Sequence, residues 1–582
     1  MIIAACGGGG ETTDTTGAGG DTTAAAADTT AAADTTAAAD TTAATDTTAG
    51  EEPTDTTAAA SGDFSGKSVA AESCDAADYD GKISSIEATG EFEVVFDLCS
   101  PDPAFLQKMA FIPFGIQPEE HLEATGGAPL ENPIGTGPFV LDAWNRGSDV
   151  VMSANPDYWG EPPSFQTLVF RWATESTSRI VELQSGNAQY ATSLSASDYE
   201  VVEGDPNLQL LEDQNPNILY IGFTNTFEPF VNPDVRRAVG LGIDRQAIVD
   251  TYYPTGSEVA THFTPCSIEN GCAGDPWAEF DPEAGRQLLA DAGFPDGFDT
   301  TIYLRDVFRV YLPEPQNVAQ GIQTQLAENL GINAEIQVME SGAFIEESNA
   351  GNLDGMYLLG WGADYPHVTN FLDSHFAGTT QFGEIDQRIT DLLAEGAATV
   401  DPAEAEPIYA EANNLLQETV PMIPMVHGAA ADVALAALDG AMVPPFGAPQ
   451  FDKMTPEGDT LVFVQNAEPI SMFCADESDG ESLSACEQVM EALYDYDPET
   501  GEPVPALAEE CAPNDDGTQW TCTLREGVTF HDGSTFDAND VVTTWAMGID
   551  ASNPLHVGNS GVFFYYEYLW GGLMNAPPAE EG

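Results

Sequence analysis

Nine cysteines are the residues of this chain whose spacing points most clearly to chemistry. Cys6 stands alone near the start, whereas the other eight fall into four local pairs. An even set of spaced cysteines is typical of disulfide bonds in an exported protein. Zinc is less favoured, because no Cys-x2-Cys occurs and none of the seven histidines stands beside a cysteine pair. We therefore predict no metal site, and the disulfides Cys74–Cys99, Cys266–Cys272, Cys474–Cys486 and Cys511–Cys522.

Acidic side chains are the other groups that could do chemistry. The 582 residues include 96 Asp and Glu against 15 Lys and Arg, a formal net charge of −81. Paired carboxylates can act as general acid and base, so a carboxylate-dependent hydrolase is one hypothesis. No pair stands out from the acidic background, however, and no nucleophile elbow or Ser, His and Asp order supports covalent catalysis.

The charge also argues against some partners. Binding to DNA or RNA phosphates needs clustered cations, and only four lysines occur. The same charge disfavours docking of the protein surface on anionic lipid. It favours solubility through self-repulsion. No run of 18 or more apolar residues occurs, which argues against an integral membrane protein.

The N-terminal segment predicts a lipid anchor followed by a tether. Residues 3–7 resemble a bacterial lipoprotein box in which Cys6 receives lipid. The next segment repeats Asp-Thr-Thr-Ala-Ala-Ala from Asp28 and has almost no large apolar side chains, so we expect a disordered spacer. Only five residues precede Cys6, so most of a signal peptide is missing, and we expect a misplaced start codon or a gene cut upstream.

The elements that must position these residues follow from the hydrophobic pattern. Residues 92–98 alternate between apolar and other side chains, which predicts a half-buried strand. Apolar residues recur every fourth position over 318–330, which predicts a helix that Gly331 ends, and residues 332–338 alternate again as a strand. A helix, glycine and strand in this order are characteristic of α/β architecture.

The C-terminal part predicts a strand, a turn and a helix. Residues 520–524 place apolar side chains on one strand face. Asp537 is the expected N-cap of a helix whose apolar stripe runs from Val541 to Ile549 at a spacing of four. No nucleophile, base or metal cluster is visible in this part of the sequence.

Several short segments together resemble family 5 solute-binding proteins, the large extracytoplasmic receptors of peptide-type ABC importers. Each match is weak alone, but together they cover about residues 78–452 and 458–582. The segments similar to the family's signatures are Asn132–Phe139, Asn155–Gly160, Leu183–Gly186, Gly222–Thr226, Asn232–Ala238, Ile243–Arg245, Ala290–Phe294, Gly360–Tyr365, Leu524–Gly533 and Asp537–Val541.

The resemblance implies an α/β, two-lobed fold of the periplasmic-binding-protein type (type II), with mixed sheets and a cleft that closes on a ligand between the lobes. It implies a monomeric receptor, lipid-anchored or periplasmic, that delivers a peptide or similar small solute to the permease subunits of an ABC transporter. It implies no enzyme activity and no cofactor. The hydrolase, and a tethered surface or adhesion protein without a transport role, are the alternatives.

The resemblance also assigns ligand-binding residues. In peptide-binding relatives a Trp-x-Ala-Asp stretch supplies the aspartate that pairs with the ligand's α-amino group, and Asp364 occupies that position. A desolvated ammonium group needs such a carboxylate partner. Leu358 stands where some oligopeptide receptors carry an arginine for a carboxylate, so the ligand stays open among dipeptide, oligopeptide, nickel chelate and sugar. The residues implied are Asp364, Trp361, Ala363, Tyr365, Glu468, Asn225 and Phe223, of which the last two are also open to a purely structural interpretation.

The segments do not follow the family's order. The block that resembles the family's N-terminal signature, Leu524–Val541, comes last here. Each signature occurs once, and the two blocks together have the length of one receptor, so we predict a circular permutation rather than a tandem pair whose second copy packs independently. The predicted parts are a truncated lipoprotein box (1–6), the tether (7–63), a central and C-terminal receptor part (64–450), a joining linker (451–458) and a segment that resembles the family's N-terminal part (459–582).

Overall fold

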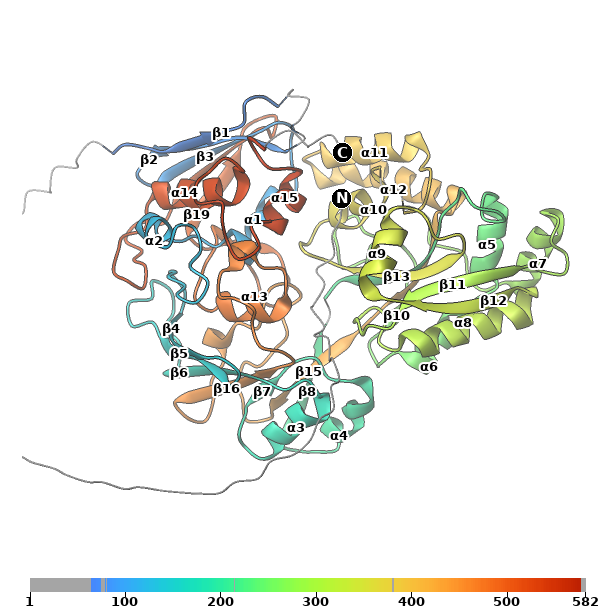
Figure 1. The fold of residues 1–582 in the computed structure, drawn as a ribbon, viewed down its shortest axis with the longest axis horizontal. Helices are drawn as coiled ribbons and strands as arrows, with labels where there is room; N and C mark the ends of the chain where they lie inside the picture. The colour runs from blue at the N-terminus through green and yellow to red at the C-terminus, as the bar shows by residue number, and fades with distance from the viewer. Residues whose placement is uncertain (1–63, 75–78, 80, 214, 379–380, 577–582) are drawn as a thin grey trace, which may run out of the picture. The chain divides into compact units, whose positions relative to one another are not determined.

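The folded part of the chain is built on three mixed or antiparallel sheets (Figure 1). The computed structural model describes residues 64–74, 79, 81–213, 215–378 and 381–576, and residues 65–582 belong to one compact unit. The proposed lipidation site Cys6 and the tether lie outside the described residues. In the part of the chain described, no helix is both long enough and apolar enough to cross a bilayer.

The first sheet combines the beginning and the end of the folded chain. Its order is β1-β2-β3-β20-β19, and β20 pairs antiparallel with β3, placing Trp520 opposite Phe96. The predicted alternation holds in β3, where Val94, Phe96 and Leu98 are buried. The bounds are β1 Ser68–Ala70, β2 Ile83–Gly90, β3 Glu93–Leu98, β19 Ala508–Pro513 and β20 Gln519–Leu524.

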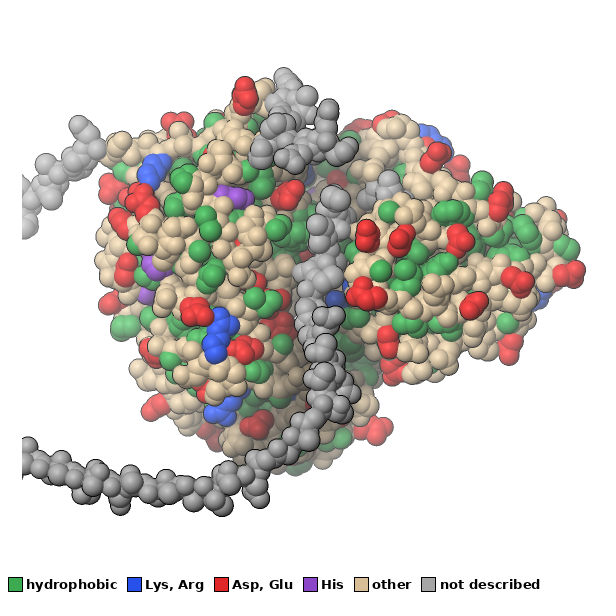
Figure 2. Space-filling model, in the orientation of Figure 1, with side chains coloured by type: hydrophobic (Ala, Val, Ile, Leu, Met, Phe, Trp, Pro, Cys, Tyr) green, Lys and Arg blue, Asp and Glu red, His purple; other side chains and the backbone are tan. Residues whose placement is uncertain are grey.

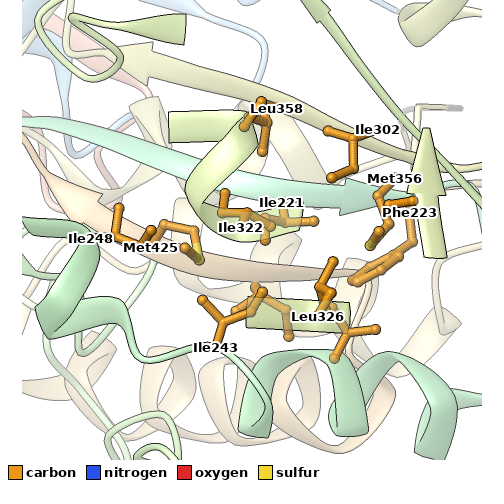
Figure 3. Packing of buried hydrophobic residues seen from close by; sticks show 14 of the residues in the cluster. Ile221, Phe223, Ile243, Ile248, Ile302, Ile322, Leu326, Met356, Leu358 and Met425 are labelled. Atoms are coloured by element: carbon orange, nitrogen blue, oxygen red, sulfur yellow. The ribbon is translucent and has the colours of Figure 1, made fainter. Parts of the chain in front are cut away.

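The second sheet has six strands in the order β10-β14-β9-β13-β11-β12. Helix α8 (Pro315–Leu330) connects the parallel strands β11 and β12 and buries Ile322 and Leu326 against the sheet (Figure 3). The helix ends at Gly331, whose φ of 70° is the left-handed conformation that suits glycine. The strands are β9 Asn217–Phe223, β10 Glu258–Val259, β11 Asp299–Arg305, β12 Asn333–Met339, β13 Met356–Gly362 and β14 Met422–His427.

The third sheet has seven strands in the order β4-β5-β6-β16-β7-β15-β8. Strand β16 (Thr460–Gln465) enters from the C-terminal part of the chain and lies parallel to both β6 and β7. Buried hydrophobic clusters lie around this sheet, separate from the cluster around α8. The other strands are β4 Phe139–Asn145, β5 Asp149–Ala154, β6 Thr167–Trp172, β7 Tyr190–Ala191, β8 Leu208–Asp213 and β15 Ala430–Leu435.

The chain passes between the seven-stranded and six-stranded sheets twice. Strand β8 is followed by β9, and β14 is followed by β15, so each sheet is the base of one lobe. Short connections of this kind are suitable hinges. The two-stranded sheet consists of β17 (Tyr494–Tyr496) and β18 (Pro503–Pro505).

The remaining helices cover the sheets. Helix α14 begins with the predicted cap, because the Asp537 side chain accepts a hydrogen bond from a helix N–H while Asp540 bonds back to the cap residue. The remaining α-helices are α1 Phe105–Met109, α2 Glu119–Thr125, α3 Ser176–Gln184, α4 Tyr199–Glu203, α5 Pro233–Leu241, α6 Arg245–Tyr252, α7 Pro282–Asp291, α9 Ser341–Asn349, α10 Leu372–Phe376, α11 Gln387–Ala397, α12 Pro402–Thr419, α13 Gly480–Cys486, α14 Ala538–Ile549 and α15 Phe564–Trp570. Short 3-10 turns occur at Ile112–Phe114, Ala196–Asp198, Val368–Asn370, Phe451–Lys453 and Cys474–Asp476.

The C-terminal segment 459–582 shares its core with the rest of the chain. Strand β16 lies inside the third sheet and β20 lies inside the first. The backbone N–H of Lys82 donates to the carbonyl of Trp570 at 2.7 Å, and Asn575 donates to the carbonyl of Ala70 at 3.4 Å. The two ends of the described chain are therefore neighbours. In the family's segment order, Gly582 would be followed by Asp78. Both residues lie outside the described part of the chain.

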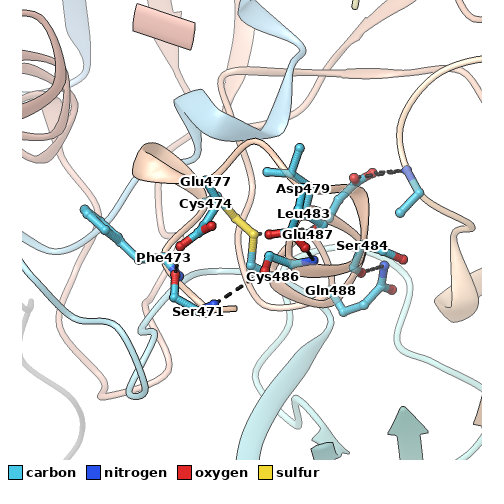
Figure 4. The surroundings of a disulfide bond; sticks show 12 residues. Ser471, Phe473, Cys474, Glu477, Asp479, Leu483, Ser484, Cys486, Glu487 and Gln488 are labelled. Atoms are coloured by element: carbon cyan, nitrogen blue, oxygen red, sulfur yellow. Dashed lines mark hydrogen bonds between the residues drawn. A yellow bond between two sulfur atoms is a disulfide. The ribbon is translucent and has the colours of Figure 1, made fainter. Parts of the chain in front are cut away.

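All four predicted cysteine pairs are bonded in the structure. Their Cα–Cα distances are 5.5, 5.0, 6.0 and 4.0 Å, all below the separation of about 7 Å that a disulfide cannot span. The pair Cys474–Cys486 ties helix α13 to the turn that precedes it (Figure 4). This bond matters for the site, because α13 contributes to a cavity.

Candidate functional site

A cavity of about 390 Å3 is lined by residues from both lobes. The six-stranded lobe contributes Ala363 and Asp364, which follow β13, and Val310. The seven-stranded lobe contributes the ends of several strands, and α13, Tyr565, residues 111–112 and residues of the segment 443–449 also belong to the lining. A site lined from two lobes around two hinge connections is suited to a ligand that is enclosed when the lobes close.

Four neighbouring strands of the seven-stranded sheet, β16, β7, β15 and β8, have one end at this cavity. Strands β16 and β7 are parallel and lead to Gln465 and to Thr192–Ser193, whereas the antiparallel β15 begins near Asp432. Strand β8 ends at Asp213, diagonally across from Asp432 in the register of the pair β8–β15. The sheet therefore places one polar residue after another along a single edge of the cavity.

Asp364, assigned from the resemblance, lies in the cavity lining. One carboxylate oxygen accepts a hydrogen bond from the side-chain amide of Asn370 at 3.1 Å, and Asn370 in turn accepts from the Asp364 backbone N–H at 3.0 Å. Burial raises the pKa of Asp364 to about 6, and this single hydrogen bond opposes the rise only partly. No described Lys or Arg forms an ion pair with it.

Three further carboxylates in the lining have raised pKa values. Burial raises the pKa of Asp432 to about 7, and the nearby Asp213 adds to this effect. Burial also raises the pKa of Asp213 and, further still, that of Glu487. Glu487 accepts the backbone N–H of Ala448 at 3.0 Å. Sequence reasoning missed these residues, although an acid inside the apolar run Ala430–Leu435 was an available signal.

The lining has acids but no basic side chain. Asp213, Asp364, Asp432, Glu481 and Glu487 belong to it, whereas no Lys, Arg or His does among the described residues. Outside the cavity, Asp and Glu side chains are spread over an open surface with few Lys and Arg (Figure 2). The exposed Arg309 precedes the lining residue Val310, and its guanidinium donates to the carbonyl of Phe308. The lining therefore offers carboxyl groups but no cation to a ligand.

Two of the other assigned residues support the Asp364 loop rather than line the cavity. The indole N–H of Trp361 donates to Asn370 at 3.0 Å, so Trp361 and Asp364 share one partner. Tyr365 is buried, hydrogen bonds to Thr369 at 3.1 Å and faces the Lys108 ammonium, 5.3 Å from its ring. Both therefore hold the shape of the loop.

The structure places three assigned residues away from the cavity. Phe223 is fully buried in the core around α8, so it has no face open to a ligand. The Asn225 side chain bonds to the backbone of Glu384, which favours the structural interpretation. The Glu468 carboxylate faces the β4–β5 hairpin, where it accepts from Trp144 at 3.2 Å and from Gly147 at 3.0 Å.

Leu358, the position compared with an arginine in some relatives, is 1% exposed and belongs to the core around α8. This position faces the core and not the cavity. The question of carboxylate binding is therefore not answered by the identity of residue 358.

One cluster with metal-ligating atoms was not expected from the sequence. His262, Cys266 and Cys272 offer ligand atoms that all lie within 4.8 Å of one another. His262 is four residues before Cys266, a spacing that a search for adjacent histidines overlooks. Because Cys266 and Cys272 are joined in a disulfide, their sulfurs are not thiolates, and thiolate is the form that binds zinc.

Comparison with known proteins adds the family. The chain matches the family model for bacterial extracellular solute-binding proteins, family 5 (middle), over residues 25–383 and 502–561. It is 29% identical to di/tripeptide-binding protein 1 of Pseudomonas aeruginosa over 384 residues, 64% of this chain and 71% of that protein. It is 30% identical to the glutathione-binding protein GsiB of Salmonella paratyphi A over 356 residues, 59% of this chain and 68% of that protein.

A solved structure supports the fold. The chain is similar to the ABC transporter-associated periplasmic binding protein DppA from Helicobacter pylori, solved in complex with the peptide STSA. The TM-score is 0.54 at 25% identity, and the match covers 65% of this chain and 75% of that one. The predicted α/β fold of the periplasmic-binding-protein type is thereby confirmed. Because the family model spans more than half of its residues, this chain belongs to the family 5 bacterial extracellular solute-binding proteins.

Proposed function

We propose that this protein is the receptor of an ABC importer and binds a peptide in the cavity between its lobes, with Asp364 pairing with the peptide's α-amino group. The observation that carries the proposal is the half-buried Asp364 carboxylate, which lines the cavity without a basic partner among the described residues. A protonated amine supplies the missing charge. The relatives named for binding di- and tripeptides support this ligand class.

Lobe closure couples ligand binding to delivery. Asp364 belongs to the six-stranded lobe, whereas Asp432 and Gln465 belong to the seven-stranded lobe, so a ligand that contacts both stabilises the closed arrangement. A permease that recognises the closed form then receives only loaded receptors. The family consists of solute-binding proteins and not of enzymes, so the hydrolase hypothesis is set aside.

A lipid on Cys6 and the tether of residues 7–63 would hold the receptor at the outer face of the membrane. This part of the proposal rests on the lipoprotein-like residues around Cys6 and on the repeat composition. Expression behind a complete signal peptide tests it. The expected result is a lipid-sized mass increase on the peptide that begins with Cys6, and its loss, with release of the protein, in Cys6→Ser.

The segment order is a circular permutation of the family's order. The shared sheets and the hydrogen bond between Lys82 and Trp570 support this interpretation, because one receptor core then contains both blocks. A reordered variant with residues 455–582 placed before 78–450 should fold and bind the same ligand. Failure of that variant to fold, or a source gene that carries a second complete copy, would contradict the permutation.

Native mass spectrometry of protein purified from cell extract tests the receptor function. We expect a co-purifying mass that fragments as a peptide and is lost from Asp364→Ala. Turnover of a substrate panel, or binding of a non-peptide solute that Asp364→Ala leaves unchanged, would contradict the proposal.

A further inference from the structure

The strand ends that meet at the cavity carry hydrogen-bond acceptors whose capacity is not used up. The Gln465 side chain is 1% exposed, and its amide nitrogen donates to the carbonyls of Ala467 at 2.9 Å and Glu481 at 3.4 Å. Its Oε1 atom is buried and has no hydrogen-bond partner. A buried acceptor without a donor is costly, and here it belongs to a residue that lines the ligand cavity.

Asp432 lies on the same edge of the sheet, on strand β15, which β7 separates from β16. The Asp432 side chain is 5% exposed and accepts the Tyr190 hydroxyl at 2.9 Å and the Ser193 N–H at 2.8 Å. Asp213, close enough to raise the pKa of Asp432, accepts one N–H, from Asn215 at 2.9 Å. The Thr192 side chain also bonds to Asp432. A carboxylate has about four acceptor positions, so both carboxylates retain unused acceptor capacity.

Close to Asp432 lies the buried Arg179, whose guanidinium donates to backbone carbonyls in the described structure. None of the ion pairs formed among the described residues includes Asp213 or Asp432, and the lining has no basic side chain. The carboxylates of Asp213 and Asp432 and the Oε1 atom of Gln465 are all hydrogen-bond acceptors. A positively charged group with several N–H donors could bind to them. The guanidinium of Arg and the ammonium of Lys are such groups.

We propose that Gln465, Asp432 and Asp213 form a second cation-binding subsite, which binds the side chain of a Lys or Arg residue in the peptide ligand. This inference rests on the proposed function and adds to it a ligand class, peptides with a basic side chain. Asp364 binds the α-amino group from the other lobe, so a basic peptide bridges the two lobes by charge at both ends. An acidic peptide meets only carboxylates along the same edge.

Calorimetry with three tripeptides tests the subsite, using Ala-Ala-Ala, Ala-Lys-Ala and Ala-Glu-Ala at pH 8 on protein dialysed free of ligand. We expect Ala-Lys-Ala to bind at least about tenfold more tightly than Ala-Ala-Ala, the effect of one added charged hydrogen bond. Asp432→Asn should remove most of this preference, so that Ala-Lys-Ala and Ala-Ala-Ala bind to the variant with similar affinities. Asp213→Asn gives the same test if Asp432→Asn does not fold.

Glu212→Gln is the matched control. Glu212 is exposed, precedes Asp213 on the same strand and does not line the cavity, so this variant should keep the full preference for lysine. Binding of Ala-Ala-Ala without a preference for Ala-Lys-Ala, or tighter binding of Ala-Glu-Ala, overturns the second subsite and leaves the receptor function intact. Absence of binding for all three peptides overturns both.

Discussion

Two regions of this protein shift the pKa values of carboxyl groups in opposite directions. Asp102 lies against two lysines, with Lys108 Nζ at 2.5 Å and Lys82 Nζ at 3.7 Å, and these cations hold the pKa of Asp102 well below its usual range despite its burial. In the cavity, Asp364 and Asp432 have no such partner, and burial raises their pKa values to about 6 and about 7.

The difference shows where the chain uses its few cations. Only four lysines occur in 582 residues, and two of them lie at Asp102. The buried charge of Asp102 is therefore paired within the protein, as stability requires. The cavity carboxylates lack that pairing, which is the pattern expected where the partner arrives with the ligand.

Breaking the internal pair gives the largest expected effect. Lys108→Met leaves Asp102 buried with only the more distant Lys82, so the free energy of unfolding should fall by about 3–5 kcal/mol. Urea denaturation measures it. Lys453→Met is the control, because Lys453 pairs with Asp452 at 2.8 Å on a half-exposed side chain, and its loss should cost at most about 1 kcal/mol. Equal losses in the two variants would show that the buried pair is not special.

The cavity acid with the assigned role comes next. Asp364→Ala should weaken binding of a free tripeptide by about 1.5–3 kcal/mol, because it removes a charged hydrogen bond to the α-amino group. Isothermal titration calorimetry measures the affinity. An N-acetylated peptide provides the control, since it lacks the amine and should bind equally to both proteins. Unchanged affinity for the free peptide would remove Asp364 from the site.

Whereas Lys108→Met should lower the free energy of unfolding, Asp432→Asn should raise it in the ligand-free protein. Its folded-state pKa of about 7 lies above the unfolded value, so the folded state binds more protons and loses stability as pH rises through this range. Asp432→Asn resembles the protonated form, and Tyr190 can then donate to the carbonyl of Met442 instead, at 3.3 Å.

The variant should therefore raise the free energy of unfolding at pH 8 by on the order of 1–3 kcal/mol and change it little at pH 4.5. Thermal or urea unfolding at both pH values measures this. A destabilised variant at pH 8 would mean that the Asp432 hydrogen bonds outweigh its unpaired charge.

The sequence predicts the local parts of this picture and misses the assembled ones. Helix α8, Gly331 and β12 follow from periodicity, because adjacent residues decide them. Asp364 follows from a contiguous motif that resembles a known family. The edge with Asp213, Asp432 and Gln465 depends on how β16 enters the sheet between β6 and β7, a long-range pairing that no local pattern encodes. Glu468 illustrates the opposite error, since its chain position suggests the ligand but its carboxylate faces a hairpin.

The smallest expected effect is also the most direct test of the comparison. If a basic peptide places its ammonium groups beside Asp364 and Asp432, both carboxylates acquire the kind of partner that Asp102 already has, and their pKa values must fall. Near pH 6.5, between the values of about 6 and about 7, binding should then release a fraction of a proton, chiefly from Asp432. Calorimetry of Ala-Lys-Ala binding in two buffers of different ionisation enthalpy measures this number. Above about pH 8, where both carboxylates are ionised and the α-amino group of the free peptide is largely neutral, release should give way to proton uptake by that amine. The release at pH 6.5 should fall in Asp432→Asn. Binding that takes up protons at pH 6.5, or releases none, would show that the cavity carboxylates are not paired by the ligand.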